Sequence, residues 1–194
     1  VLSLFIFNYL LANKINIISE SDLLNVSTVL NAFRINVTSS KILVFPHSVQ
    51  VNFNSNNSYI KVNHTFCSVC WMSTKGNVIR KGLDKAMKFF YLYCQYHPNS
   101  LFYVIGRVGE GTEYIKSLPY YKSVAQNVIF TDFLSDEQKF EILSSSIFYF
   151  QLSNYEGFGI AALEANLCKC FVLHSGSGGY LSSPDIWGAK VIES

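Results

Sequence analysis

Two glutamates near a pair of glycines have the residue types and spacing that sugar or phosphate chemistry would need. The letters EGFGI begin at Glu156, and Glu164 follows eight residues later. If a helix starts here, position 164 returns to nearly the same face as position 157, about 10 Å along the axis. One carboxylate at the mouth of a site and one along a helix suit an elongated ligand with several hydroxyls, such as a nucleotide sugar.

The glycines complete this pattern. Gly157 and Gly159 permit a tight turn and the close approach of a ligand to the backbone. With Phe158 between them, they would leave unpaired N–H groups at a helix N-terminus, where phosphate or hydroxyl oxygens can accept hydrogen bonds. Spacing alone leaves a plain alternative open, in which Glu156 interacts with the helix dipole and Glu164 is a solvated charge.

Apolar runs typical of buried strands alternate with helical runs from about residue 65 onward. Strands are expected at 65–72, 101–106, 127–131, 147–151, 170–174 and 189–192. Helices are expected at 83–96, 112–121, 136–144 (with Ser135 as N-cap) and 158–167. Continuous apolar strands between helices predict an α/β, Rossmann-like, doubly wound parallel sheet, whose ligands bind beyond the carboxyl ends of the strands.

Upstream, the pattern indicates a second unit. A strand at 16–18, a helix at 22–33 and a strand at 41–45 precede an Asn- and Ser-rich stretch. We therefore expect residues 1–50 to be the C-terminal remnant of another α/β domain and residues 51–63 to be a linker. Residues 64–194 would form the main domain, truncated at its C-terminus, so we interpret the chain as a fragment.

The composition excludes several classes of protein. Of the 194 residues, 49% are hydrophobic, 15% aromatic and only 14% charged, which excludes intrinsic disorder. The net charge of +2 has no basic run behind it, so we expect no nucleic-acid partner. The apolar residues 1–12 are too few for a membrane span, which needs about 20. Five cysteines, an odd number, favour reduced thiols and a cytoplasmic location.

The stretch from Glu156 to Glu164-Ala165 resembles the E-x7-E motif of retaining GT-B glycosyltransferases of family 4, the glycosyl transferases group 1. Other landmarks of that family follow in the expected order over most of residues 15–180. They are Ser19-Glu20, residues 41–47, RKGLD from Arg80, YVIG from Tyr103, NVIF from Asn127 with Leu134-Ser135, and Gly178-Gly179. The resemblance implies a C-terminal, nucleotide-sugar-binding domain joined to a remnant of the N-terminal, acceptor-side domain.

For the donor sugar, the resemblance implies that Glu156 is catalytic, contacting the sugar and stabilising the transition state. The backbone amides beside it belong to donor-binding residues, which are Gly157, Phe158, Gly159 and Ile160. The reaction implied is transfer of a sugar from a nucleotide-diphosphate sugar to a glycan or lipid-linked acceptor, with retention of configuration, as in polysaccharide biosynthesis.

For the nucleotide, the resemblance implies that Glu164 binds the ribose hydroxyls. Lys81, also catalytic and helped by Arg80, would neutralise the diphosphate as charge builds on the leaving group. The plain alternative for Lys81 is a solvated residue near a helix start, where a cation is slightly unfavourable. Family members generally need no metal and no other cofactor. They often act at the cytoplasmic membrane face, here through an acceptor domain that this chain would lack.

The sequence also departs from the family. Where many members have Gly-Arg at a strand end, this chain has Cys70-Trp71, followed by a longer loop at 73–79. Arg80, or less favourably Lys75, is the candidate substitute for that arginine. The alternative function is therefore a non-catalytic module that binds a nucleotide sugar or a partner. We expect the isolated fragment to turn over weakly or not at all.

Other patterns fit function less well. Cys67-x2-Cys70 and Cys168-x-Cys170 could suggest zinc, but a spacing of three in a strand puts Cys67 and Cys70 on opposite faces. GRVGEG from Gly106 has the spacing G-x-x-G-x-G rather than that of a dinucleotide fingerprint. His47 is a possible ligand contact beside the interdomain cleft.

Overall fold

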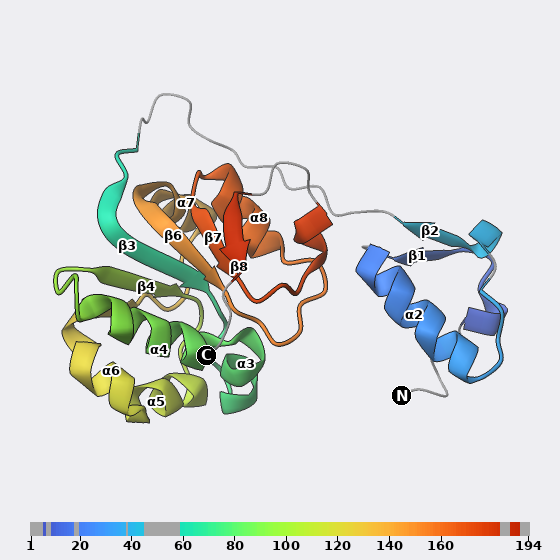
Figure 1. The fold of residues 1–194 in the computed structure, drawn as a ribbon, viewed down its shortest axis with the longest axis horizontal. Coiled ribbons are helices and arrows are strands. Elements are labelled where there is room, and N and C mark those ends of the chain that lie inside the picture. The colour runs from blue at the N-terminus through green and yellow to red at the C-terminus, as the bar shows by residue number, and fades with distance from the viewer. Residues whose placement is uncertain are drawn as a thin grey trace.

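A computed structural model describes residues 6, 9–17, 20–37, 39–44, 59–182 and 187–190 of the chain. His47, most of the expected linker and the end of the last expected strand lie outside these residues. Figure 1 shows a larger α/β unit within residues 59–190 and a smaller unit within residues 9–44.

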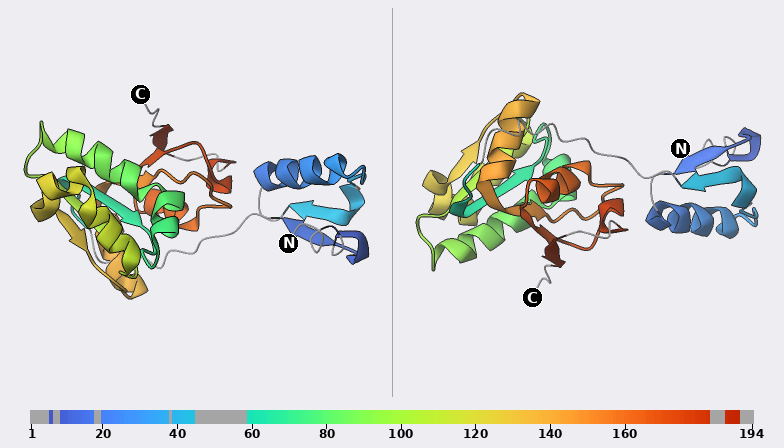
Figure 2. Two further views of the ribbon diagram at one scale, coloured as in Figure 1. Left: turned by 90° about the horizontal axis from the view of Figure 1, so that it is seen from below. Right: turned by 90° about the horizontal axis from the view of Figure 1, so that it is seen from above.

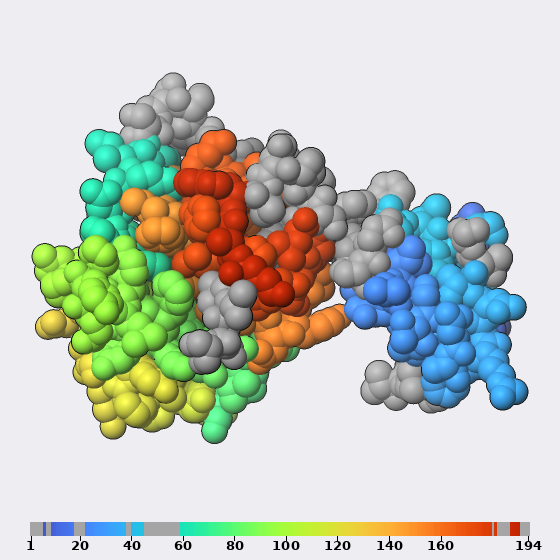
Figure 3. Space-filling model, viewed as in Figure 1, coloured from blue at the N-terminus to red at the C-terminus, as the bar shows by residue number. Residues whose placement is uncertain are grey.

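The larger unit is built on a six-stranded sheet in which every pairing is parallel, with the order β5-β4-β3-β6-β7-β8. The strands are β3 (Val62–Val69), β4 (Leu101–Ile105), β5 (Val128–Phe130), β6 (Ser146–Gln151), β7 (Phe171–His174) and β8 (Gly188–Lys190). Because β3 pairs with both β4 and β6, segments far apart in sequence lie side by side (Figure 3). The predicted parallel α/β fold is confirmed.

Helices cover both faces of this sheet (Figure 2). The first face carries α3 (Lys75–Lys81), α4 (Leu83–Cys94), α5 (Glu110–Ser117) and α6 (Pro119–Val124). The second face carries α7 (Asp136–Ser145) and α8 (Ile160–Leu167). Two short 3-10 helices, η2 (Ala125–Asn127) and η3 (Gly179–Ser182), complete the unit.

The two faces have separate hydrophobic cores. Phenylalanines dominate the first, where the rings of Phe66 and Phe150 stack with centroids 5.1 Å apart. Cys67 and Tyr149 lie in the second core, against α7 and α8. Neighbouring residues of a strand thus enter different cores, as period-two alternation requires. Cys70 lies in the first core, so the prediction that it faces away from Cys67 is confirmed.

The predicted start of α7 is confirmed by its cap. The Ser135 hydroxyl accepts a hydrogen bond from the Gln138 N–H (3.3 Å), and the Gln138 side chain accepts one from the Ser135 N–H (3.1 Å). This reciprocal capping box satisfies two N–H groups that the helix leaves unpaired.

Two expected elements were wrong. The helix expected at 112–121 is two helices, because Pro119 begins α6 and Leu118 before it is extended. The loop expected at 73–79 is mostly α3, whose N-terminus is capped by the Thr74 hydroxyl, 3.2 Å from the Asn77 nitrogen. Lys81 therefore lies in the last turn of α3, where a cation is favourable, and also just before the expected helix start at Leu83, whose N-cap is Gly82.

The boundaries of β3 and α8 also shifted. β3 begins at Val62 and ends at Val69, so it starts inside the expected linker and stops before 72. The backbone still continues beside β4, since the N–H groups of Cys70 and Met72 donate to Ile105 and Arg107. The helix expected at 158–167 starts at Ile160, because Gly159 caps it in a left-handed conformation with φ +88°.

The smaller unit pairs β1 (Ile15–Ile17) with β2 (Ile42–Val44) in parallel, across α2 (Glu20–Ala32) and η1 (Ser39–Lys41). Its core contains Tyr9, Ile17, Leu30 and Ile42. A parallel strand pair connected by a helix is the unit from which α/β domains are built. No helix within the described part of the chain is long and apolar enough to cross a membrane.

Candidate functional site

The candidate site lies where β3 and β6, which are neighbours, reach their carboxyl ends. Gly82, between α3 and α4, has φ +66°, and a Cβ atom there would lie 1.9 Å from the Leu152 carbonyl oxygen. Only glycine lets the two backbones approach this closely. The Asn154 N–H donates to the Arg80 carbonyl (2.8 Å), so the loop after β6 holds the end of α3.

This contact brings together two of the predicted catalytic residues. The Lys81 ammonium lies 2.5 Å from Glu156 Oε2. The two side chains are only 25% and 12% exposed, so the ion pair is partly shielded from water. Such a pair interacts more strongly than one on the open surface.

The same carboxylate oxygen accepts two further hydrogen bonds that the sequence did not predict. Gln151 Nε2 lies 2.9 Å from Glu156 Oε2, and the Ser153 hydroxyl lies 3.2 Å from it. Both side chains are buried. Neither carries a local signal, since a polar residue at a strand end is common in any fold.

The stretch after β7 supports the loop from its other side. The Ser177 hydroxyl accepts the Glu156 N–H at 3.0 Å, and the Gly179 N–H donates to the Gly157 carbonyl at 2.8 Å. The Ser175 hydroxyl donates to the Ser153 carbonyl at 2.6 Å. The loop that carries Glu156 is therefore fixed by α3 on one side and by this stretch on the other.

Around the predicted glycines the structure is partly open. Nothing lies within 4 Å of the position that a Cβ atom on Gly157 would occupy. Phe158 is buried at 8% exposure, whereas Ile160 is 42% exposed on the first turn of α8. A ligand can thus reach the backbone at Gly157, close to the Glu156 carboxylate.

Glu164 forms a second ion pair. Its Oε1 lies 3.0 Å from the Lys139 ammonium of α7, which also lies 3.1 Å from Asp136. Burial alone would lower the pKa of Lys139, but the hydrogen bonds to Glu164 and Asp136 outweigh this effect and raise it. Lys139 is therefore held as a cation, a role that was not predicted from the sequence.

The charges of Glu156 and Glu164 both affect the pKa of the buried Tyr149 hydroxyl. Burial raises the pKa of Tyr149 well above its ordinary value, and the hydrogen bond from the Val69 N–H partly offsets this rise. The charges of Glu156 and Glu164 add to it. The Tyr149 hydroxyl therefore stays protonated.

Residues 75–183, more than half of the chain, match the sequence profile of the family described as glycosyl transferases group 1. The chain belongs to this family. No match was found among curated protein sequences.

Solved structures of GT-B glycosyltransferases share the fold of this chain. TarM of S. aureus aligns with a TM-score of 0.73 at 18% identity, over 97% of this chain and 35% of that one. WaaG, a glycosyltransferase involved in lipopolysaccharide biosynthesis, gives 0.68 at 18%, over 93% and 49%. The pneumococcal O-GlcNAc transferase GtfA, in complex with UDP and GlcNAc, gives 0.72 at 14%, over 94% and 34%. The chain thus spans between about a third and a half of these chains.

Arg80 and Lys75 are the candidates to replace the arginine that the family resemblance leads us to expect. Neither side chain takes part in the Lys81–Glu156 contact. Arg80 is exposed, and its carbonyl rather than its guanidinium binds the loop. The Lys75 ammonium lies over the Tyr114 ring, 4.6 Å from its centroid, and so points toward α5. Trp71, in the Cys70-Trp71 stretch where the resemblance leads us to expect Gly-Arg, is 69% exposed and follows the end of β3 by two residues.

The cysteines lie in the hydrophobic cores, where the thiols of Cys67 and Cys170 also donate to backbone carbonyls. All five are free and buried, and burial raises the pKa of Cys70, Cys94 and Cys168 to about 11. Within the described residues, no group of three or more His, Cys, Asp or Glu side chains could hold a metal ion. Gly109, in the GRVGEG stretch, caps α5 instead of opening a nucleotide-binding fold.

Proposed function

We propose that this protein is a retaining glycosyltransferase and that residues 64–194 carry most of its donor-binding domain. It would transfer a sugar from a nucleotide-diphosphate sugar to a glycan or lipid-linked acceptor. The observation that carries the proposal is the partly buried Lys81–Glu156 pair, beside the open backbone at Gly157. Membership of the glycosyl transferases group 1 family supports it.

Each residue of the site has a proposed role. The Lys81 ammonium stabilises the negative charge that develops on the leaving diphosphate. Glu156 accepts hydrogen bonds from hydroxyls of the donor sugar, and Glu164 accepts them from the ribose. The amides from Gly157 to Ile160 lie beside the sugar and phosphates, and Arg80 adds positive charge near the entrance. No metal or other cofactor has a part in this scheme.

The nature of the ligands is inferred from the structural relatives. TarM was crystallised with UDP and α-GlcNAc-glycerol, and GtfA with UDP and GlcNAc. These complexes support a nucleoside diphosphate as the leaving group. WaaG's part in lipopolysaccharide biosynthesis supports a glycan or lipid-linked acceptor. We place the protein in the cytoplasm, at the membrane face where such acceptors are found.

Binding by the chain tests the donor site directly. Isothermal titration calorimetry with UDP, GDP and ADP should give binding of at least one of them. We expect Lys81→Ala and Glu164→Ala to weaken it at least about tenfold, since each removes a charged contact. Lys75→Ala is the matched control, because this lysine of the same helix packs over Tyr114. If none of the three nucleotides binds, the proposal is wrong.

A second candidate is the non-catalytic module, which the exposed Trp71 in place of the family's arginine favours. The longer protein should be assayed for hydrolysis of, or transfer from, UDP-, GDP- and ADP-sugars, with Glu156→Ala as the inactive control. Binding that Glu164→Ala abolishes, without any turnover, would select the module. Turnover that Glu156→Ala abolishes would select the enzyme.

A further inference from the structure

Gln151 is a buried amide aimed at the candidate catalytic carboxylate. It is the last residue of β6 and is 4% exposed. Its Nε2 lies 2.9 Å from Glu156 Oε2 and 3.0 Å from the Ser153 hydroxyl oxygen. A carboxylate oxygen can only accept, so the NH2 side of the amide must face Glu156. A buried amide that follows four apolar or aromatic residues of β6, Ile147–Phe150, calls for a specific reason.

The reason lies in how Glu156 is held. One of its oxygens accepts hydrogen bonds from three donors, which are Lys81, Gln151 and Ser153. Of these donors only Lys81 is charged. A diphosphate that enters the site competes with Glu156 for that charge, since an ammonium interacts with both anions.

Transfer of the Lys81 ammonium from Glu156 to the diphosphate would cost much free energy if Lys81 were the only hydrogen-bond partner of Glu156. A partly buried carboxylate without a counter-charge is strongly unfavourable, and it would either keep the lysine or move toward water. Hydrogen bonds from neutral donors offset part of that cost, and they are stronger when the acceptor is ionised. Being neutral, the Gln151 amide does not itself attract the incoming diphosphate.

We propose that Gln151, assisted by Ser153, is a positioning residue that keeps Glu156 in place while the Lys81 ammonium is transferred to the donor diphosphate. This inference rests on the proposed function, because it assumes a diphosphate at this site. Gln151 acts through Glu156 and Lys81 and does not touch the substrate. Gln151 thereby determines how readily the Lys81 ammonium separates from the Glu156 carboxylate.

The test compares a diphosphate with a nucleoside. Gln151→Met keeps the size of the side chain but removes the donor. In the 194-residue chain, calorimetry should show UDP binding (or GDP or ADP, whichever the unaltered chain binds) weakened about tenfold. Binding of the corresponding nucleoside, which has no phosphate, should change less than about twofold. Ser153→Ala should also weaken binding of the nucleoside diphosphate selectively, but by a smaller factor.

A double variant separates positioning from packing. With Glu156→Gln, Lys81 no longer has an anionic partner to leave, so adding Gln151→Met should weaken diphosphate binding less than about twofold. Asn127→Leu is the matched control. It removes another buried amide, which donates to the carbonyls of Pro98 and Ser100 at the amino end of the sheet. This variant should lower stability and leave binding unchanged.

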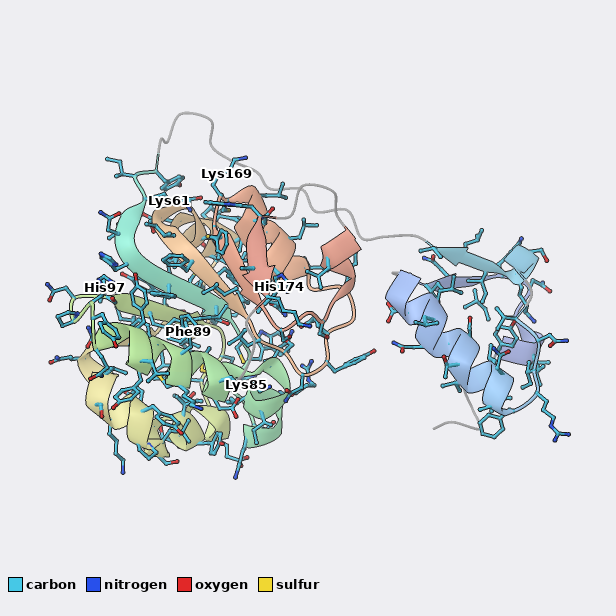
Figure 4. All side chains as sticks on the ribbon, in the orientation of Figure 1. Lys61, Lys85, Phe89, His97, Lys169 and His174 are labelled. Carbon is cyan, nitrogen blue, oxygen red and sulfur yellow. The ribbon has the colours of Figure 1, made fainter. Side chains whose placement is uncertain are left out.

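The control lies in another part of the sheet from the site, because Asn127 directly precedes β5, three strands away from β6. His97, close to Pro98 in sequence, lies at the amino end of the sheet, whereas His174 marks the carboxyl end of β7 (Figure 4). Stability of each variant is measured by urea unfolding, so that a binding loss in a chain that has lost its fold is recognised.

The outcomes distinguish the two proposals. If the unaltered chain binds UDP, GDP or ADP but Gln151→Met binds it equally well, the role of Gln151 is refuted and the donor site stands. A loss equal for nucleoside and diphosphate, or one that persists in the Glu156→Gln background, also refutes it, because both indicate packing alone. Failure of the unaltered chain to bind any of them refutes the proposed function itself.

Discussion

Replacing Gly82 with alanine would test whether the tight corner between α3 and α4 places Lys81 against Glu156. The new Cβ atom would lie 1.9 Å from the Leu152 carbonyl oxygen and 2.5 Å from its carbon, so the backbone must move. The left-handed conformation at φ +66° costs about 1–2 kcal/mol for a residue with a Cβ atom. Overpacking adds about 1–3 kcal/mol. Together these effects should lower the free energy of unfolding by about 2–5 kcal/mol.

Gly76→Ala, in the same helix, is a control that should change the free energy of unfolding in the opposite direction. Gly76 lies in α3 with nothing closer than 3.9 Å to its Cβ position. Alanine exceeds glycine in helix propensity by about 1 kcal/mol, so Gly76→Ala should raise the free energy of unfolding by up to that amount. Urea unfolding followed by far-UV circular dichroism measures both changes. Gly82→Ala should also weaken nucleotide binding, because Lys81 adjoins the displaced corner.

Two results would refute this reasoning. If Gly82→Ala lowers the unfolding free energy by less than about 1 kcal/mol, the corner yields easily and does not constrain Lys81. If Gly82→Ala destabilises the protein but leaves nucleotide binding unchanged, the contact with Leu152 supports the fold and not the position of the ammonium.

Three further predictions concern ionisable groups. Lys139→Met leaves the carboxylate of Glu164 without its counter-charge and should lower the unfolding free energy by about 1–3 kcal/mol, measured in urea. Burial raises the pKa of Cys70 to about 11, so as the pH rises the unfolded chain loses the thiol proton before the folded chain does. The free energy of unfolding should therefore fall between about pH 9 and 11, and it should fall less steeply in Cys70→Ala. Burial, and then the charge of Lys190, lowers the pKa of His174, whose Nδ1 accepts the Gly176 N–H. The unfolded chain therefore takes up the proton first below about pH 6.5, and His174→Gln should reduce the loss of stability on acidification, followed by thermal unfolding.

The parallel sheet could be predicted because each strand carries its own signal. β4 and β7 are continuous apolar runs next to helical segments, and Ser135 with Gln138 marks the start of α7. These signals act over a few residues and do not depend on the rest of the fold. Periodicity and capping therefore sufficed for the fold class and for most element boundaries.

Other elements lacked such a signal, or carried one that was overlooked. α3 buries only Val78 and contains a glycine, so its sequence has no apolar stripe. Its helical state depends on the Thr74 cap and on packing against the rest of the unit. Pro119, in contrast, was a readable signal, since proline favours the first position of a helix and here separates α6 from α5.

Residue partners across the sheet depend on strand order. Lys81 and Glu156 are 75 residues apart and were predicted by family resemblance, but only the pairing of β3 with β6 makes them neighbours. Gln151 and Lys139 were missed for the same reason. A glutamine at a strand end and a lysine on a helix become informative only when the opposite element is known.

The two ion pairs of the site differ in a way that bears on the proposed orientation of the donor. In both, a lysine faces a glutamate at low exposure. Glu156 has neutral donors besides its lysine, so it can release the charge to an anion such as a diphosphate. Glu164 depends on Lys139, which Asp136 also holds. Ribose hydroxyls are neutral and can donate to Glu164 without displacing that lysine. The hydrogen bonds around each carboxylate thus favour the diphosphate beside Glu156 and the ribose beside Glu164.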